Sequence, residues 1–450
     1  MNDIESGSQR DAPRRQIGVW EAVSVCVGMV IGAGIFRSPA VVAANVGSDL
    51  EMLLAWAFGG AMSLIGALCF AEMAAAFPDP GGDYHFLRRA FGARAGFLFA
   101  WSRFAVIHTG SMAMLAFVFG DYLGELLGYG PLGSSVLAAL AIAVLTALNL
   151  TGLRAGIGTQ LGLMLIVFAG LLAVGVAGIV LATTGQPPLA PGGAAAPPSA
   201  HIGTALVFVF LAYGGWSDAA TLSAEMRDPR RGITRALVAG MAMVTALYLL
   251  ANWAYLRGLG LAGVAASQAP AADLMLRAFG PVAQTCIVAV VAVTTITSMN
   301  AILIAGARTT YAAVRDTGGL DALGHWHLAR GTPASAMIAI SAVALGLVGL
   351  GTWTRSGFAT MVDYLAPVYW LFLTLSGASL IVLRRRLPNA PRPFRVPAYP
   401  WPPIAFMAAS AYMVYASVAY VRIGTIAGIG ILLAGLALLV FLERRTIEGP

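Results

Sequence analysis

Two short glycine-containing interruptions lie inside otherwise apolar runs of this sequence. The first reads Ile31-Gly32-Ala33-Gly34-Ile35-Phe36, and Pro39 follows shortly after it. The second runs from Leu211 to Asp218 and reads Leu-Ala-Tyr-Gly-Gly-Trp-Ser-Asp. Glycine and proline weaken a helix, so backbone N–H and C=O groups at these points can be left without intrahelical partners. Such groups bind ions and polar ligands, which is the chemistry of a binding site.

The two ends of a broken helix match the two charges of a zwitterion. Unwinding exposes N–H groups at one end and C=O groups at the other, each carrying about half an elementary charge. We expect the N–H groups around Ala33 to Ile35 to bind a carboxylate, and the carbonyls around Val30 and Leu211 to bind an ammonium group. The predicted substrate-binding positions are Val30, Ile31, Gly32, Ala33, Gly34, Ile35, Leu211, Ala212, Gly214 and Gly215.

The separation of the two interruptions suggests internal symmetry. Gly34 and Gly215 are 181 residues apart, which is five predicted membrane spans. A shift by an odd number of spans reverses the direction of crossing, so the two halves would form an inverted repeat. Glycine in a membrane helix more often serves close packing when it is taken alone. Interruptions at matching positions of two halves favour a transporter site instead.

The elements that hold these interruptions are predicted to be membrane-spanning helices. Hydrophobic residues make up 59% of the 450 residues and charged ones only 10%, whereas soluble domains carry about 25% charged residues. The apolar blocks are long enough to cross a bilayer as helices, and the short alternating segments of a membrane β-barrel are missing. The twelve predicted spans are 18–45, 51–77, 94–124, 133–151, 157–183, 202–226, 234–257, 281–312, 334–351, 358–383, 401–421 and 424–442.

Arginine placement predicts the orientation, because cytoplasmic loops retain positive residues. With the N-terminus inside, 21 of the 27 arginines lie in cytoplasmic segments and 5 on the opposite side. We therefore expect both termini to be cytoplasmic. The predicted organisation is a tail at 1–17, a first repeat at 18–183, an extracytoplasmic linker at 184–200, a second repeat at 201–384, and two further spans with a short tail at 385–450.

Polar residues inside the spans are candidates for coupling or gating, since burying an ionisable group is costly. Asp218 could bind the substrate ammonium, accept a proton, or cap the helix that follows it. Ser298 and Asp363 are further coupling candidates, although hydroxyls near Ser298 can instead bond back to their own helix. Tyr213 and Trp216 are candidate gating aromatics, with ordinary core packing as the alternative. Glu225, which lies close to several arginines, is a gating candidate or a solvated surface residue.

Four ionisable residues near the predicted cytoplasmic ends of spans have two interpretations each. Glu72 and Asp83 could form gate ion pairs or be solvated. Arg103 is expected to extend toward the cytoplasm rather than to gate. His108 could titrate near neutrality, although a packing role is the expected one.

The sequence motifs of other protein classes are missing from this chain. The chain contains no Gly-x-Ser-x-Gly, no His-Glu-x-x-His and no Cys/His cluster, so we expect no enzyme, no metal and no cofactor. A nucleic-acid binder would gather its arginines on a soluble face, and a channel would need a selectivity ring. A transport-like sensor stays an alternative, although no soluble output domain is evident.

Several longer motifs resemble the amino acid–polyamine–organocation superfamily of transporters, and its bacterial amino-acid permeases in particular. The matching segments are 27–40, 77–92, 212–237, 298–316 and 384–403. The resemblance implies an all-α, LeuT-like fold of five plus five inverted helices with two peripheral ones, about twelve in all. It also implies a substrate bound at the broken first and sixth helices, alternating access, and a bacterial inner membrane location.

Two positions depart from that family pattern. Many similar permeases have a phenylalanine lid immediately before Ala-Tyr-Gly-Gly-Trp, where this chain has Leu211. Many sodium-independent relatives also carry a lysine in the fifth helix, whereas this chain contains no lysine. The coupling ion therefore does not follow from the resemblance.

The combined expectation is a transporter that moves amino acids by alternating access. It would be driven by a proton gradient or by exchange of substrates, with sodium not excluded. A polyamine or cationic amino-acid antiporter is the alternative, and it would require acidic residues at the site. The expected partners are an amino-acid substrate and the lipid bilayer, without an obligatory protein partner.

Overall fold

The computed structural model describes residues 18–79, 81–151, 157–185, 201–219, 226–227, 229–317, 333–354, 356–420 and 422–447. Its secondary structure consists of helices joined by short loops, as expected where backbone groups must be paired within one segment in lipid. The helices are α1 Val19–Val30, α2 Gly34–Ala43, α3 Asp49–Ala76, α4 Asp83–Phe91, α5 Ala93–Ser102, η1 Arg103–His108, α6 Thr109–Leu127, α7 Pro131–Leu150, α8 Ile157–Thr183, α9 Ile202–Ala212, α10 Pro229–Ala266, α11 Pro270–Phe279, α12 Pro281–Thr317, α13 Ala334–Thr352, α14 Gly357–Arg386, α15 Trp401–Tyr420 and α16 Arg422–Ile447.

The predicted spans correspond to helices in the structure. Among the described residues, nine helices are long and apolar enough to cross a membrane, with α5, η1 and α6 forming one of them. The pair α1 and α2 forms a further span that is bent by 46° at its break. Two shorter apolar helices, Ile202–Ala212 and Ile426–Phe441, fall in the remaining predicted spans. The all-helical, multi-span prediction is confirmed.

Two short helices lie in segments between the predicted spans. Helix α4 follows α3, and α11 follows α10. Each is amphipathic and about ten residues long, too short to be distinguished from a loop by its apolar content. Helix α10 also extends beyond its predicted end, through a kink at Gly260, where φ is 72°.

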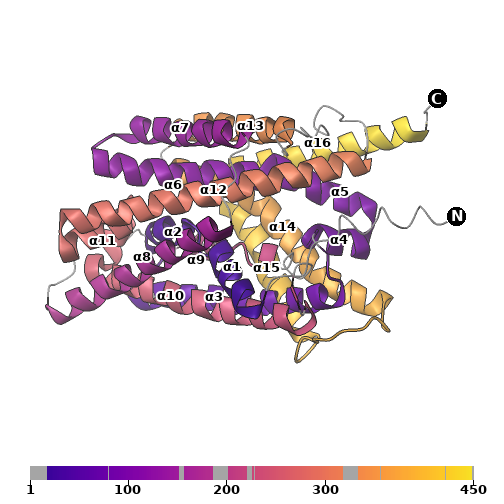
Figure 1. Ribbon diagram of the computed structural model, residues 1–450, viewed down its shortest axis with the longest axis horizontal. Coiled ribbons are helices and arrows are strands. Elements are labelled where there is room, and N and C mark those ends of the chain that lie inside the picture. The colour runs from indigo at the N-terminus through magenta and orange to yellow at the C-terminus, as the bar shows by residue number, and fades with distance from the viewer. Residues whose placement is uncertain are drawn as a thin grey trace.

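The bundle places the broken helices at its centre. Figure 1 shows α1, α2 and α9 between α3 and α10 on one side and α6 and α12 on the other, with α7 and α13 outermost. Helix α2 packs against α9, and α1 packs against α10. The breaks therefore lie inside the protein, where irregular backbone is tolerated at membrane depth.

The third span contains one turn of π-helix, η1, between α5 and α6. A π-helical turn inserts an extra residue into the helix and commonly occurs at functional sites. Here it brings the side chains of Arg103 and His108 into contact, with Arg103 Nε 3.3 Å from His108 Nε2. This turn sets the geometry of a polar cluster next to the second break.

A buried ion-pair network joins α3, α14 and the loop before α15. The Glu72 carboxylate is fully buried and accepts hydrogen bonds from Arg384 Nε at 2.7 Å and from the Val396 N–H at 2.7 Å. Arg392 Nε lies 3.4 Å from the same carboxylate. These contacts fit the interpretation of Glu72 as a member of a gate ion pair. The interpretation of Glu72 as a solvated residue is wrong.

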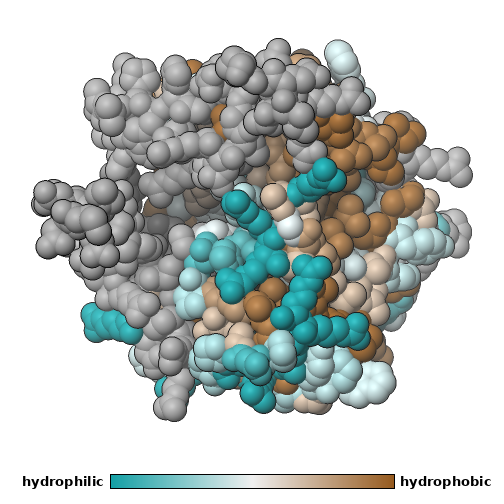
Figure 2. Space-filling model, turned by 90° about the vertical axis from the view of Figure 1, so that its right-hand side faces the viewer, coloured by the Kyte–Doolittle hydropathy of each residue, from teal (hydrophilic) through white to brown (hydrophobic). Residues whose placement is uncertain are grey.

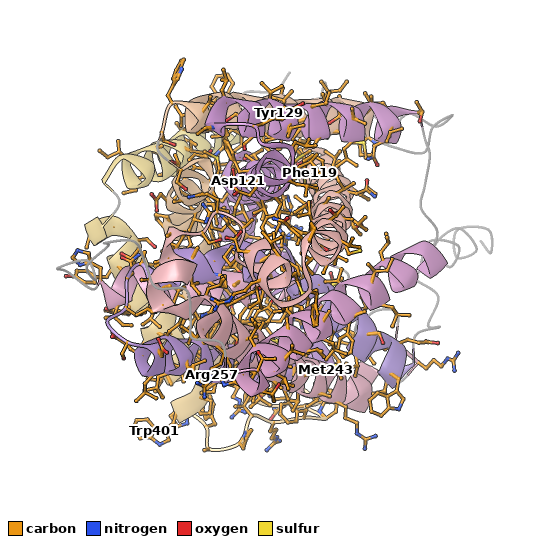
Figure 3. The ribbon with its side chains drawn as sticks, turned by 90° about the vertical axis from the view of Figure 1, so that its left-hand side faces the viewer. Phe119, Asp121, Tyr129, Met243, Arg257 and Trp401 are labelled. Atoms are coloured by element: carbon orange, nitrogen blue, oxygen red, sulfur yellow. The ribbon has the colours of Figure 1, made fainter. Side chains whose placement is uncertain are left out.

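The end of the bundle that bears α4 also carries exposed arginines. Arg88 and Arg89 on α4 and Arg385 and Arg386 on α14 are all exposed. Figure 2 looks onto this end and shows hydrophilic side chains gathered on its described part. The opposite end, where α11 lies, is viewed in Figure 3, with Asp121 inside the outline of the bundle and Tyr129 closer to its edge.

Candidate functional site

At the first break, three consecutive backbone N–H groups have no hydrogen-bond partner in the described part of the chain. Ile31 N–H donates to the Val27 carbonyl at 2.8 Å, and Gly32 N–H donates to the Val30 carbonyl at 2.8 Å. Beyond the break, Phe36 N–H donates to the Ala33 carbonyl at 3.1 Å. Among the described residues, no hydrogen-bond partner is found for the N–H groups of residues 33, 34 and 35. These are the groups that the sequence predicts to bind a carboxylate.

The second break is a tight turn at the end of α9. Gly214 N–H donates to the Leu211 carbonyl at 2.9 Å, and Asp218 N–H donates to the Gly215 carbonyl at 3.1 Å. Gly215 has φ of 99°, a conformation that side-chain-bearing residues rarely adopt. The α-helix therefore stops at Ala212, six residues before Asp218, and does not continue through the turn.

The two breaks lie against each other, backbone to backbone. A Cβ added at Gly34 would lie 3.3 Å from the Cα of Ala212. A Cβ added at Gly215 would overlap the carbonyl oxygen of Met29. Gly32 differs from both, because a Cβ added there would meet nothing within 4 Å. The open space at the first break is thus on the Gly32 side, and Gly34 serves the packing of α2 on α9.

A tyrosine on α10 joins the carbonyl ends of both broken helices. The Tyr248 hydroxyl lies 3.0 Å from the carbonyl oxygen of Val30 and 3.1 Å from that of Ala212. A phenol has one proton, so it donates to one of these carbonyls at a time. Both carbonyls belong to the set that the sequence predicts for an ammonium group. Tyr248 itself was not predicted, because it sits in an unbroken apolar span with no local signal.

The two candidate gating aromatics are core residues in this structure. Tyr213 is fully buried, its hydroxyl donates to the Trp56 carbonyl at 3.0 Å, and its ring lies 4.9 Å from that of Tyr248. Trp216 is packed between Phe70, at 5.0 Å, and Phe406, at 5.8 Å. These contacts fit the packing interpretation, and a gating role for either residue stays a prediction.

A polar cluster lies beside the second break. Arg103 Nη2 donates to Asp218 Oδ1 at 2.9 Å and lies 3.2 Å from His108 Nε2. Because Arg103 has only donors, His108 Nε2 acts as the acceptor and carries no proton. The expected extension of Arg103 toward the cytoplasm is wrong, since only 15% of its side chain is exposed and its guanidinium is paired with Asp218.

Asp83, at the start of α4, belongs to the same electrostatic neighbourhood. It lies outside the membrane-spanning helices, yet only 8% of its surface is exposed. The pKa of Asp83 is raised to about 7, mainly by burial and also by the negative charge of Asp218, while Arg103 opposes both effects. The cluster therefore contains two carboxyl groups and one guanidinium group.

A second ionic contact lies on the other side of the breaks, toward α11. Arg37 on α2 is buried, with its Nε 3.5 Å from Asp121 Oδ2 on α6. Its Nη1 donates to the Ser267 carbonyl at 3.3 Å, and its Nη2 donates to the Gln268 side chain. The third span thus contacts both broken helices, through Asp121 near one end and Arg103 near the other.

The remaining coupling and gating candidates lie elsewhere. Asp363 borders a small cavity of about 10 Å³, close to the size of one water molecule, together with Thr204 and Phe208. Near Ser298, the hydroxyls of the threonines bond back to carbonyls of their own helix, as the alternative interpretation predicted; these are Thr294, Thr295 and Thr297. Glu225 lies outside the described residues. In the described part of the chain, no three His, Cys, Asp or Glu side chains are placed to hold a metal ion.

A helical bundle that crosses the membrane many times, with two interrupted helices meeting at its centre, defines the class of secondary transporters. Comparison with known proteins agrees. Residues 17–441 match the amino acid permease family, and the chain belongs to this family. It is an amino-acid transporter of the amino acid–polyamine–organocation superfamily, not an enzyme, and a multi-pass membrane protein with the LeuT-like fold.

Individual mammalian relatives cover most of the chain. It is 30% identical over 403 residues to the large neutral amino acids transporter small subunit 2 of Mus musculus, covering 88% of this chain and 75% of the relative. The Homo sapiens protein of the same name is 30% identical over 400 residues, covering 87% and 74%. The b(0,+)-type amino acid transporter 1 of Mus musculus is 30% identical over 418 residues, covering 90% and 83%.

Proposed function

We propose that this chain carries neutral, zwitterionic amino acids across the membrane by alternating access, and that it holds them at the two helix breaks. The observation that carries the proposal is the row of three N–H groups at residues 33–35 that have no partner among the residues that the structure describes, next to the carbonyls at which α1 and α9 end. The carboxylate would bind the N–H groups and the ammonium group would bind the carbonyls. Hydrogen bonds to charged groups contribute about 1.5–3 kcal/mol each.

Neutral substrates are favoured over cationic ones by the pairing of Asp218. A cationic amino acid or a polyamine needs an acidic side chain at the site to balance its extra charge. Asp218 is the acidic residue beside the breaks, and it is already paired with Arg103 at 2.9 Å. The name of the relatives that transport large neutral amino acids supports the same substrate class.

The proposed energy source is a proton gradient or exchange of one amino acid for another. The chain has no lysine in its fifth span, and the hydroxyls around Ser298 are engaged with their own helix. The engaged hydroxyls do not favour a sodium site. The missing lysine leaves the fifth span without the group found in many sodium-independent relatives, so sodium belongs among the gradients to be tested. The name "small subunit" applies to the relatives, and we propose that this chain works without an obligatory protein partner.

The proposed arrangement in the membrane follows from the arginines. The exposed arginines on α4 and at the end of α14 mark one end of the bundle, and positive residues are retained in the cytoplasm. Twelve crossings return the chain to the side where it began, so both termini would be cytoplasmic. We further propose repeats at 18–183 and 201–384 and a location in a bacterial inner membrane.

The test is uptake by the purified chain alone in liposomes. A panel of labelled L-amino acids and amines should show saturable uptake of one or more neutral amino acids. Imposed gradients of pH, sodium and internal substrate, applied separately, identify the energy source. If no amino acid is taken up or exchanged under any gradient, the proposal is wrong. If polyamines or cationic amino acids are transported and neutral ones are not, the antiporter alternative replaces it.

A further inference from the structure

The cluster beside the second break has an imbalance of charge that the transport site does not explain. Asp83 and Asp218 supply two carboxyl groups, while Arg103 supplies one guanidinium group. His108 contributes no positive charge, because its Nε2 accepts from Arg103. Among the described residues, Arg103 is the cation that acts on both carboxyl groups, and the negative charge of Asp218 disfavours ionisation of the buried Asp83.

Asp83 is the carboxyl group better suited to hold that proton. Its Oδ1 atom is buried and has no hydrogen-bond partner among the described residues. Leaving a buried carboxylate oxygen unpaired is costly, and protonation removes the charge. Asp218 has the opposite surroundings: its oxygen is paired with Arg103, and 46% of its side chain is exposed. Arg103 is therefore already the ion-pair partner of Asp218.

The groups that interact electrostatically with Asp83 come from three elements. They are Arg103 in η1, Asp218 in the turn after α9, and Tyr369 in α14. On its own helix, His85 is paired with Asp79 at 3.2 Å. Arg88 and Arg89 of α4 pack on aromatic rings, those of Tyr84 and Phe77. Arg103 is thus the cation for which Asp83 and Asp218 compete.

We propose that Asp83 is a proton-binding site that controls the position of the sixth-span break through Arg103. The Asp83 carboxylate takes up a proton from water by forming an O–H bond, and it returns the proton to water when that bond breaks. No other covalent bond changes. When Asp83 is neutral, Arg103 is fully available to hold Asp218 and the turn at Gly215. When Asp83 is ionised, the guanidinium is shared, and Asp218 is held less tightly.

The proposal assigns transport a dependence on pH and rests on the proposed function of the chain. The pKa of Asp83 is raised to about 7, mainly by burial, so its charge changes between about pH 6 and pH 8. Over that range the protonated fraction falls about tenfold. If the tightly held turn is the transporting form, uptake at a fixed substrate concentration falls by a similar factor as the pH rises.

The experiment compares wild type with Asp83→Asn in liposomes over this pH range, with equal pH on both sides. Asp83→Asn imitates the neutral carboxyl group, so its uptake should vary less than about twofold where wild type varies about tenfold. Asp79→Asn is the matched control, because Asp79 lies just before α4 and is paired with His85. It should keep the wild-type profile. Asp83→Glu, which retains a titratable group, should also keep a pH dependence.

An infrared titration provides a readout that is independent of transport. The difference between the wild-type and Asp83→Asn spectra should contain a carboxyl C=O band that disappears as the pH rises through about 7, because only wild type has this carboxyl group. A wild-type pH profile in Asp83→Asn, or a difference spectrum that lacks this band, would overturn the proposal. Amino-acid uptake by wild type that is independent of pH would overturn it as well, while leaving the proposed function intact. Absence of all amino-acid uptake would instead remove the proposed function.

Discussion

Gly215 lies against the backbone of Met29, so that a Cβ added to Gly215 would overlap the Met29 carbonyl oxygen and lie 3.0 Å from its carbon. The break in the sixth span is thus pressed onto the last turn of α1, immediately before the break in the first span. This contact places the unpaired N–H groups of one broken helix beside the carbonyl end of the other. Both halves of the proposed site depend on it.

Replacing Gly215 with alanine should disrupt the site in two ways. The left-handed backbone at φ 99° costs about 1–2 kcal/mol with a side chain, and the new methyl group has no room against Met29. We expect amino-acid affinity to fall by more than about tenfold. Gly346→Ala on α13 is the matched control, because open space surrounds Gly346. Equal affinities in binding assays of the two variants would contradict the close contact between the breaks.

Enlarging Gly32 should block the substrate while leaving the fold intact. A Cβ at Gly32 meets nothing within 4 Å, so a leucine there can project into the open space at the first break. We expect Gly32→Leu to elute as a monodisperse protein and to lose saturable binding. Gly34→Ala provides the contrast. Its methyl group would press on Ala212, so this variant should lose stability, and the methyl group should fill little of the binding site. Normal affinity in Gly32→Leu would show that the substrate binds elsewhere.

Removing the Tyr248 hydroxyl should weaken substrate binding without changing the shape of the core. The hydroxyl is within hydrogen-bonding distance of the Val30 and Ala212 carbonyls, and one such bond contributes about 1 kcal/mol. We expect Tyr248→Phe to raise the substrate dissociation constant about fivefold. Tyr255→Phe is the control on the same helix, because the buried Tyr255 hydroxyl has no partner among the described residues. A substrate affinity that is unchanged in Tyr248→Phe would show that the Tyr248 hydroxyl does not contribute to substrate binding.

Neutralising Glu72 should lower the stability of the protein and leave its substrate specificity unchanged. The buried carboxylate is paired with Arg384 and lies 3.4 Å from Arg392, and loss of one partner in a buried ion pair costs about 3–5 kcal/mol. Glu72→Gln keeps the shape and leaves two guanidinium groups without their anion. A clear fall in the unfolding temperature in detergent is expected. Glu125→Gln, at an exposed position on α6, should unfold like wild type, and equal temperatures for both variants would contradict the prediction.

The elements and the breaks could be predicted from sequence because their causes are local. Long apolar runs require helices in lipid, and the glycines at 32, 34, 214 and 215 lie at the points where the helices stop. The partners within the site depend on the tertiary fold. Arg103 and Asp218 are 115 residues apart, and Tyr248 is 218 residues from Val30. No pattern in one segment indicates such a contact, so the pairing of Arg103 and the role of Tyr248 emerged only from the structure.

The central claim is that backbone groups at the two breaks bind the carboxylate and the ammonium group of an amino acid. The most direct measurement is competition for binding of a labelled neutral amino acid that the chain transports. The competitors are its amide, which lacks the carboxylate, and its deaminated analogue, which lacks the ammonium group. Each should bind at least about tenfold more weakly than the parent, because each loses charge-assisted hydrogen bonds to the breaks. Competition by either analogue as strong as that of the parent amino acid would contradict the account.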